Sequence, residues 1–379
     1  MKYKLGDIAP IKQGTVEKND EYWLLNLDMV ESNTGHIIDY LTVRKEKIGS
    51  STVAFDTENI LYSRLRPYLN KVVLPQKCGY ATSEMLPLRP NIKVISKEYL
   101  TCFLRSLKFV EYISEKTSGA KMPRVNISDL KNVEIDCPSL EMQKKITESY
   151  DKLLSIIALR KQELEALDDL IRARFVEMFG SPVSNPMSWE KRTLKEVCKK
   201  LNDGTHFSPE SFETGAYKYV TAKNIKLTGF DFSNITYVPE EVHRPIFDRC
   251  NPEFEDVLYI KDGATTGIAM VNTLDEEFTL LSSVALLKQD RSIMNGYFLT
   301  ALLNNEDMYL DIRNSMGGAA ITRLTIAKLN AIKVIVPPMI LQNRFADFVN
   351  QINKSKVAIQ QALEQEQLLF DSLMQKYFG

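Results

Sequence analysis

The chain has 379 residues, 44% hydrophobic and 26% charged, with 48 lysines and arginines against 49 aspartates and glutamates. This length suits two or three domains, and the composition excludes a long disordered chain, a collagen-like repeat and a disulfide scaffold. The near-zero net charge excludes nucleic-acid binding through bulk positive charge, although it leaves room for local basic faces.

The five cysteines form no C-x-x-C pair, and the three histidines lie far apart. This spacing argues against a metal site, and scattered free thiols favour a reducing compartment. The N-terminus reaches charged residues before an apolar segment forms, and no apolar run approaches the ~18 residues of a membrane helix. We therefore expect a soluble, cytoplasmic protein with no membrane contact and no bound metal.

The first half of the chain predicts a globular domain followed by a long helix. Residues 1–140 carry helical spacing over 97–115 and short β-rich runs at 21–27, 59–62, 71–75 and 132–136. These patterns predict a compact α+β domain. Over residues 141–180 the apolar positions recur at alternating steps of four and three, which predicts a long helix with a heptad seam.

The second half repeats this order. Residues 181–336 follow a Pro/Ser/Asn-rich linker and carry helical spacing over 295–305 and β-rich runs at 217–220, 256–260 and 277–281. Residues 337–379 predict a second long helix. The expected fold class is therefore α+β, with two globular domains that are each followed by a long helix.

An internal repeat relates the two halves. An offset of 199 residues aligns 119–180 with 318–379 without a gap. Upstream the offset falls to 197 at residues 58–62 and to 189 or 190 near Gly14. Each half thus has a variable front and a constant back, which indicates a common scaffold that presents two different surfaces.

The two long helices each have a single apolar stripe, which needs a partner. We predict that they pair as an antiparallel coiled coil, a rod roughly 50 Å long with a domain at each end. The alternative is two unrelated amphipathic helices, each packed on its own domain. The predicted seam residues are Ile146, Tyr150, Leu153, Ile157, Leu164, Leu167, Ile171, Phe345, Val349, Ile352, Ile359, Leu363, Phe370 and Leu373.

Local charge and loop composition point to two candidate recognition surfaces. Between residues 41 and 77, seven basic residues outnumber three acidic ones and alternate with tyrosines. Such a segment suits phosphates and base edges, although a solvated face is the alternative interpretation. Loops rich in glycine and small polar residues, in which backbone amides can approach a phosphate, occur in both halves at 13–15, 118–121, 202–206, 261–267 and 316–319.

Motifs for catalysis are absent from the sequence. It contains no P-loop, no G-x-G-x-x-G after a strand and no Asn-Pro-Pro-aromatic motif of an amino-methyltransferase. Asp203, His206 and Ser208 are too close in sequence to favour a catalytic triad. We therefore expect a recognition protein without chemistry of its own.

A longer motif occurs twice, at residues 123–146 and 321–345: a basic loop, a strand, a proline, a glutamine five residues later and a long helix. The run Asn-Asp-Gly-Thr-His at 202–206, followed by Val-Thr-Ala-Lys-Asn-Ile at 220–225, is a second motif, which the first half lacks. On these motifs the whole chain resembles the DNA-specificity subunit of type I restriction-modification systems.

The resemblance implies two target-recognition domains, each reading one half of a split double-stranded DNA site. The two helices would act as a ruler and as the dock for two methyltransferase (modification) subunits. A separate restriction/translocase subunit would join that complex. S-adenosylmethionine, ATP and Mg²⁺ would belong to the partner subunits, so this chain would bind no cofactor and would be a non-catalytic subunit.

Candidate DNA-binding residues follow from the motifs. Arg124 and Arg323 are 199 residues apart, and we expect both to contact a phosphate or a guanine; a structural salt bridge is the alternative for each. The further candidates are Lys121, Arg64, Arg66 and Tyr68 in the first domain, and Thr205, His206, Lys223, Asn224, Thr265, Thr266 and Thr322 in the second.

Two other functional classes stay open. A duplicated coiled-coil scaffold or adaptor would bind other proteins through the same surfaces. A solitary nuclease is disfavoured because no acidic cluster with a neighbouring lysine stands out. The bases that are read cannot be inferred, because side-chain preferences are degenerate without a docked groove.

Overall fold

The structure, a computed structural model, describes residues 1–119, 121–316 and 323–379. The chain forms two compact units: the first comprises residues 1–161 and 361–379, and the second comprises residues 162–360. Each unit therefore combines a globular part of mixed helix and sheet with segments of two long helices, α5 (Leu140–Phe179) and α11 (Met339–Phe378). Among the described residues, no helix has both the length and the apolar character needed to cross a membrane.

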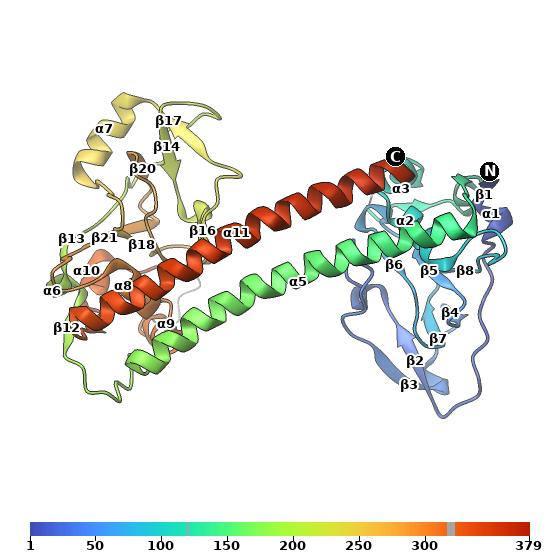
Figure 1. Cartoon of the computed structure of the whole chain (residues 1–379), viewed down its shortest axis with the longest axis horizontal. Helices are drawn as coiled ribbons and strands as arrows, with labels where there is room; N and C mark the ends of the chain where they lie inside the picture. Colours follow the sequence, from blue (N-terminus) through green and yellow to red (C-terminus); the bar gives the residue numbers. More distant parts are fainter. Residues whose placement is uncertain (120, 317–322) are drawn as a thin grey trace. The chain divides into compact units, whose positions relative to one another are not determined.

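The first unit contains two main sheets (Figure 1). One has the strand order β3-β2-β7-β4 and the other the order β6-β5-β8, while β1 pairs with β11 and β9 with β10. Its strands are β1 (Lys2–Lys4), β2 (Glu21–Leu25), β3 (Leu41–Arg44), β4 (Thr52–Phe55), β5 (Ile60–Ser63), β6 (Val72–Val73), β7 (Gly79–Thr82), β8 (Met85–Leu88), β9 (Thr117–Ser118), β10 (Arg124–Val125) and β11 (Glu134–Asp136). Its shorter helices are α1 (Leu5–Ile8), α2 (Lys97–Arg105), α3 (Leu107–Glu115), α4 (Ile127–Lys131), and the 3₁₀ turns η1 (Leu27–Met29), η2 (Lys45–Lys47) and η3 (Pro67–Leu69).

The second unit repeats this plan with sheets of order β13-β21-β18-β19 and β17-β14-β20 and the pairs β12-β22 and β15-β16. Its strands are β12 (Lys191–Thr193), β13 (Cys198–Asp203), β14 (Tyr217–Val220), β15 (Ile225–Lys226), β16 (Gly229–Phe230), β17 (Thr236–Val238), β18 (Val257–Ile260), β19 (Ala269–Val271), β20 (Phe278–Leu280), β21 (Val284–Gln289) and β22 (Lys333–Ile335). Its shorter helices are α6 (Leu194–Val197), η4 (Ala222–Asn224), α7 (Glu240–Arg249), α8 (Gly296–Leu303), α9 (Glu306–Asn314) and α10 (Ile326–Ala331).

The two globular parts differ in the front segment, where the sequence offset drifts. In both, one sheet contains a parallel strand pair, β2 with β7 in the first unit and β14 with β20 in the second. The first unit then adds β4 to the free edge of β7. At the corresponding place in the chain, the second unit has helix α7, which packs against β20. The variable front therefore changes the surface without changing the parallel strand pair.

The helical spacing over residues 97–115 predicts one helix, but the structure has two, α2 and α3. Ser106 separates them in an extended conformation, with φ −63° and ψ 143°. Its hydroxyl oxygen accepts a hydrogen bond from the backbone N–H of Phe109 at 3.4 Å. Serine favours such N-cap positions because its side chain satisfies an N–H that the helix leaves unpaired. A periodicity count does not register this break, because the apolar face continues on both sides of it.

Equivalent glutamines tie the start of each long helix to its globular part. The Gln143 side-chain amide donates to the carbonyls of Val94 and Pro138, both at 2.9 Å, and its oxygen accepts from the Ser96 N–H at 2.9 Å. In the second unit, Gln342 makes the corresponding bonds to the carbonyls of Ile293 and Pro337 and from the N–H of Asn295, at 3.0, 2.7 and 2.9 Å. Both glutamines are completely buried. The conserved geometry shows that the internal repeat holds at the level of single hydrogen bonds.

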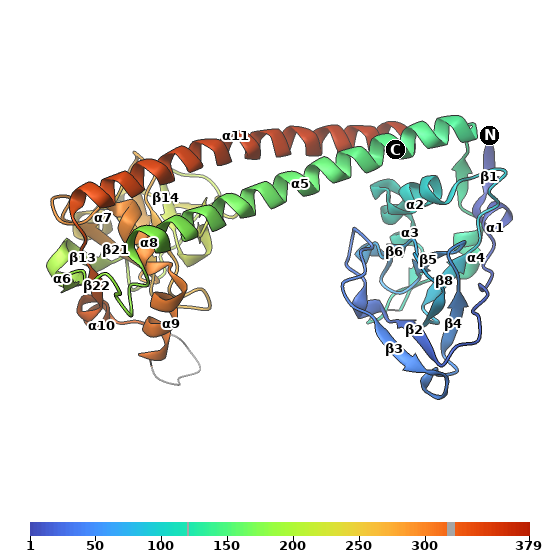
Figure 2. The same ribbon diagram turned by 60° about the horizontal axis from the view of Figure 1, so that its bottom comes forward.

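The aromatic end of each long helix lies in a hydrophobic core. In the first unit, the Phe378 ring at the end of α11 lies 5.2 Å from Tyr99 of α2. In the second unit, the Phe179 ring at the end of α5 lies 4.7 Å from Phe298 of α8. Figure 2 shows that α2 lies beside the start of α5, with β2 and β3 at the far end of the first unit. The same aromatic contact therefore completes both cores.

The residues of the predicted seam are buried or half-buried along both helices. Charged residues interrupt this stripe and meet opposite charges on the other helix. In the first unit, the Arg160 Nε lies 3.5 Å from a carboxylate oxygen of Glu366. In the second unit, the Lys356 Nζ lies 2.7 Å from a carboxylate oxygen of Asp168. Within each unit, the segments of α5 and α11 thus contact each other through apolar side chains and ion pairs.

Candidate nucleic-acid interface

In the first unit, the two predicted DNA-binding segments lie side by side. The backbone N–H of Val125 donates to the carbonyl of Arg64 at 2.9 Å, and the N–H of Arg66 donates to the carbonyl of Pro123 at 2.8 Å. Arg66 adopts a left-handed conformation with φ +49°, which lets the chain turn from β5 into η3. Residues 64–68 and 121–125, far apart in the sequence, therefore form one surface.

Glu84 holds two of the predicted arginines on this surface. The Arg124 Nε donates to one carboxylate oxygen of Glu84 at 2.9 Å, and the Arg64 Nε lies 3.4 Å from the other oxygen. All three side chains are partly accessible, with 34% of the Arg124 side chain exposed. One carboxylate thus faces two guanidinium groups, so this cluster keeps a net positive charge.

The remaining candidates of the first unit belong to the same two segments, residues 64–68 and 121–125. Arg66 and Lys121 are exposed, and the Tyr68 side chain in η3 is 53% exposed. Exposed cations and an exposed aromatic ring can contact phosphates and bases without a change in the fold. The surface is thus basic and carries an aromatic side chain.

The second unit has the equivalent loop pair. Asp262 and Arg323 form an antiparallel bridge, as Leu65 and Arg124 do in the first unit. The Arg323 Nε lies 3.5 Å from a carboxylate oxygen of Asp262, and 56% of the Arg323 side chain is exposed. Thr322, the neighbouring candidate, lies outside the described residues.

A buried ion pair supports the loop that carries His206. The Lys261 Nζ lies 3.2 Å from an oxygen of Asp203, and these side chains are only 2% and 4% exposed. The other oxygen of Asp203 lies 3.2 Å from the Nε2 of the exposed His206. Gly204 lets this loop lie against β20, because a Cβ at that position would overlap the Leu280 carbonyl.

Three second-unit candidates have buried side chains: Thr205, Asn224 and Thr266. The Asn224 side-chain oxygen accepts from both the N–H and the hydroxyl of Thr221, and its amide donates to the carbonyl of Asp231. The Thr266 hydroxyl donates to the Gly263 carbonyl at 2.7 Å. These side chains shape the loops from inside, whereas Lys223 and Thr265 are exposed on the same loops.

The sequence alone did not predict the pairing of these carboxylates and cations, nor a cation between two rings. The Lys77 Nζ lies 4.5 Å from the Trp23 ring centroid and 4.3 Å from the Tyr40 centroid. Asp203 and Asp262 lie within the segments that were singled out, and Glu84 follows the basic segment 41–77, but only the tertiary structure brings each of them to its partner. A count of charges along one segment does not predict such pairs, because the partners come from different parts of the chain.

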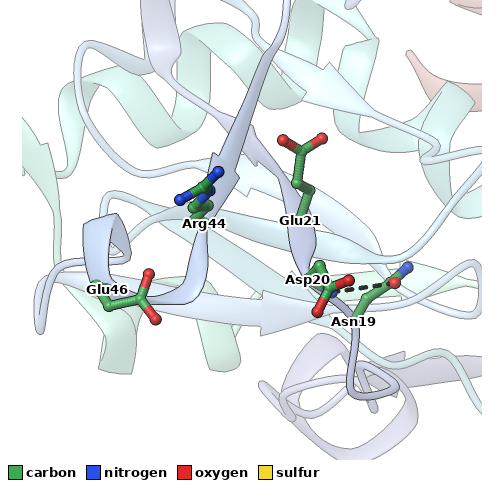
Figure 3. A pocket seen from close by; sticks show the side chains of 5 residues that line it. All are labelled: Asn19, Asp20, Glu21, Arg44 and Glu46. Atoms are coloured by element: carbon green, nitrogen blue, oxygen red, sulfur yellow. Dashed lines mark hydrogen bonds between the residues drawn. The ribbon is translucent and has the colours of Figure 1, made fainter.

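A polar hollow lies where β2 begins and β3 ends, outside these loops (Figure 3). Its lining side chains include one cation, Arg44, and the carboxylates of Asp20, Glu21 and Glu46, together with Asn19. The excess of acidic groups disfavours a phosphate backbone there. This hollow is therefore not part of the candidate interface.

The described residues present no candidate metal cluster, and burial shifts the pKa of several cysteine and histidine side chains. They contain no group of three or more His, Cys, Asp or Glu side chains that could hold a metal ion. Burial raises the pKa of the Cys198 and Cys250 thiols to about 12, so both stay protonated. Burial lowers the pKa of His243, which stacks on the Tyr217 ring at 3.8 Å.

Comparison with known proteins relates the whole chain to one family. A family model described as the type I restriction modification DNA specificity domain matches residues 1–169 and again residues 186–368. Among curated proteins, the type I restriction enzyme MjaIX specificity subunit of Methanocaldococcus jannaschii is 24% identical over 306 residues, which cover 76% of this chain and 69% of that protein. The EcoDI specificity subunit of Escherichia coli is 28% identical over 139 residues, or 36% of this chain and 31% of that protein.

Solved structures share the fold over the full length. The S subunit of a type I restriction-modification system from M. genitalium has a TM-score of 0.63 at 18% identity, with 100% of this chain and 96% of that chain covered. A chain from work on complex assembly and conformational transition of the type I R-M system has a TM-score of 0.60 at 19% identity, with 100% and 97% covered. The fold is thus common to these proteins.

Proposed function

The chain belongs to the type I restriction modification DNA specificity family, and from this membership we propose that its two units each recognise one half of a bipartite, gapped site in double-stranded DNA. The observation that carries the proposal is the equivalence of the two basic loop pairs. The bridge between Leu65 and Arg124 recurs as the bridge between Asp262 and Arg323. Two loop pairs with the same backbone bridge but different exposed side chains are suited to binding two different half-sites.

The two long helices would set the distance between the half-sites as an antiparallel coiled coil. Contacts inside each unit support this pairing, since Tyr150 contacts Phe370 in the first unit and Phe175 contacts Phe345 in the second. As the residue number rises along α5, the partner's number falls along α11. Each helix has 40 residues, so at 1.5 Å per residue it is about 60 Å long.

The outer faces of the helices would dock partner subunits. Large apolar side chains are exposed there, away from the seam, at Leu159, Val357, Leu368 and Leu369. Exposed apolar groups on a helix favour protein contacts. We expect two methyltransferase subunits on this surface and a restriction/translocase subunit in the larger complex. S-adenosylmethionine, ATP and Mg²⁺ would be bound by those partners, and this chain would act as their non-catalytic, cytoplasmic specificity subunit.

Methylome sequencing tests the proposal directly. Host DNA is sequenced with and without this chain, in a strain that expresses the methyltransferase partner. We expect one gapped, bipartite methylation motif to disappear when the chain is absent. An unchanged methylome in that strain would contradict the proposed function and favour a scaffold or adaptor that binds only proteins.

A further inference from the structure

The equivalent basic loops of the two units neutralise their cations in different ways. In both units, the first loop is held by the same backbone bond: Arg64 N–H donates to the Glu84 carbonyl at 3.0 Å, and Lys261 N–H donates to the Ser283 carbonyl at 2.9 Å. A carboxylate in the first unit is thus replaced by a hydroxyl in the second.

This replacement changes where each cation lies. Lys261 points into the interior, to the buried Asp203, and is withdrawn from the surface. Arg64 stays with Glu84, at the surface, and shares that carboxylate with Arg124. The first unit therefore presents two guanidinium groups side by side, whereas the second presents Arg323 with its neighbour Asp262.

Glu84 engages the inner edge of both guanidinium groups. It accepts a hydrogen bond from the Nε of Arg124 at 2.9 Å and forms an ion pair, without a hydrogen bond, with the Nε of Arg64 at 3.4 Å. Each guanidinium has five N–H groups in a fixed plane. Among the described residues, Arg124 makes one further contact, from Nη1 to the Met122 carbonyl at 3.3 Å. The other Nη donors of the two arginines have no protein partner in that part of the chain. A carboxylate that binds at Nε fixes the plane of the guanidinium and leaves these donors for a ligand.

We propose that Glu84 is a positioning residue that orients Arg64 and Arg124 toward paired hydrogen-bond acceptors on the DNA of the first half-site. The inference rests on the proposed function and deepens it. The acceptors are either two phosphate oxygens or the O6 and N7 atoms of a guanine, which present similar geometry to a guanidinium. In the second unit Ser283 occupies the position equivalent to Glu84, and Arg323 has the separate partner Asp262, 3.5 Å from its Nε.

The sign of the effect of a substitution separates positioning from simple charge. Removal of a negative charge from a DNA-binding surface strengthens binding to every duplex, because the repulsion of phosphates falls. Loss of a positioning carboxylate weakens binding, because two flexible arginines must then be ordered when DNA binds. These two effects have opposite signs.

The test uses Glu84→Ala in the full chain, assembled with its methyltransferase partner. Binding is measured over a salt series to the cognate duplex and to duplexes scrambled in the first or in the second half-site. We expect cognate affinity to fall about tenfold, the effect of losing one well-oriented arginine contact. If the loss is confined to duplexes with an intact first half-site, the acceptors are on a guanine; if it is equal on all duplexes and the salt slope falls, they are phosphates. Unchanged or tighter cognate binding would overturn the inference.

Two further variants keep this test decisive. Glu84→Gln preserves side-chain size and one acceptor, so it distinguishes loss of orientation from loss of folding; we expect a smaller decrease than for alanine. Asp262→Ala is the matched control, because Asp262 lies 3.5 Å from the Nε of one mostly exposed arginine in the second unit, whereas Glu84 accepts a hydrogen bond from the Arg124 Nε at 2.9 Å. The effect of charge should therefore dominate in this variant, and we expect equal or tighter binding to all duplexes. In each variant the penalty for scrambling the second half-site should stay as in the wild type, whereas general unfolding would lower it. A wild-type complex that prefers no duplex would refute the proposed function itself. A wild-type preference together with a cognate affinity that Glu84→Ala does not lower would refute only the role of Glu84.

Discussion

At the scale of single residues, the buried glutamines show how the duplicated scaffold is held. Gln143 joins three backbone groups of the first unit, and Gln342 joins the three equivalent groups of the second. One of these groups is the backbone N–H of a helix N-cap residue. This residue is Ser96, just before α2, in the first unit and Asn295, just before α8, in the second. A glutamine is suited to this position because its amide both donates and accepts. The long helices are thus joined to the globular parts by polar as well as apolar contacts.

Gln143→Leu should strongly destabilise the first unit. Leucine has a similar size but leaves one N–H and two carbonyls unpaired in the interior, each at a cost of about 1–3 kcal/mol. We expect the free energy of unfolding to fall by about 3 kcal/mol or more, measured by urea titration with hydrogen exchange to assign the unit. Gln351→Leu, at an exposed site on α11, is the control and should change stability by less than about 0.5 kcal/mol. Equal effects of the two substitutions would contradict the role of the buried amide.

At the same scale, burial divides the predicted DNA-binding residues into two kinds. Arg66, Tyr68, Lys121, His206 and Arg323 are accessible to a ligand. The buried side chains of the second-unit loops instead bond to neighbouring backbone groups. Asn and Thr are frequent in both situations, because the same polar groups that contact DNA also stabilise turns.

At the scale of elements, the long helices combine an apolar stripe with ion pairs at chosen places. Arg160 and Lys356 interrupt the stripe, and each meets a carboxylate of the other helix within its own unit. Charged pairs at such positions favour one register, because a shift would leave the charges unpaired. The ion pairs thus help to fix the register of the two helix segments, in addition to the burial of apolar side chains.

Removal of one heptad from each helix should shorten the gap in the recognised DNA site. Residues 158–164 and 361–367 are suitable, since both segments belong to the seam region around the Arg160–Glu366 pair. Seven residues of helix correspond to about 10 Å, or about three base pairs. The measurement is the methylation motif made by the variant with its partner methyltransferase. Insertion of seven residues in both helices should lengthen the gap, and a motif that neither change alters would refute the ruler.

At the scale of the whole molecule, each long helix contributes to both units. Helix α5 begins beside the first globular part and ends with Phe179 in the core of the second unit. Helix α11 begins in the second unit and ends with Phe378 in the core of the first. The two units are therefore not consecutive segments of the chain, because each core is completed by the helix that starts in the other.

This exchange predicts that mutations at the helix ends act on opposite units. Phe378→Ala should destabilise the first unit, and Phe179→Ala the second, each by about 3 kcal/mol as is typical for a buried phenylalanine. Hydrogen exchange followed by mass spectrometry should show lost protection in α2 for the first variant and in α8 for the second. Loss of protection in the same unit for both variants would contradict the assignment of the two cores.

The sequence by itself determined the duplication, the two long amphipathic helices and the mixed α+β character of the domains. These features follow from chain order, because a repeat offset and a heptad period are visible without any contact. Strand positions such as Tyr217–Val220 were also correct, since β-rich runs between turn residues are local signals. The break at Ser106 was missed, because capping depends on one side chain and not on the periodicity around it.

Only the tertiary structure decided which charges meet. Arg124 and Glu84 are forty residues apart in the chain, and Lys261 reaches Asp203 across the second unit. The two units use the same backbone frame, yet one keeps its arginines at the surface and the other buries its lysine. The physical reason is that the state of a charged side chain depends on burial and on partners brought close by folding, whereas the fold class depends mainly on the order of apolar and polar residues.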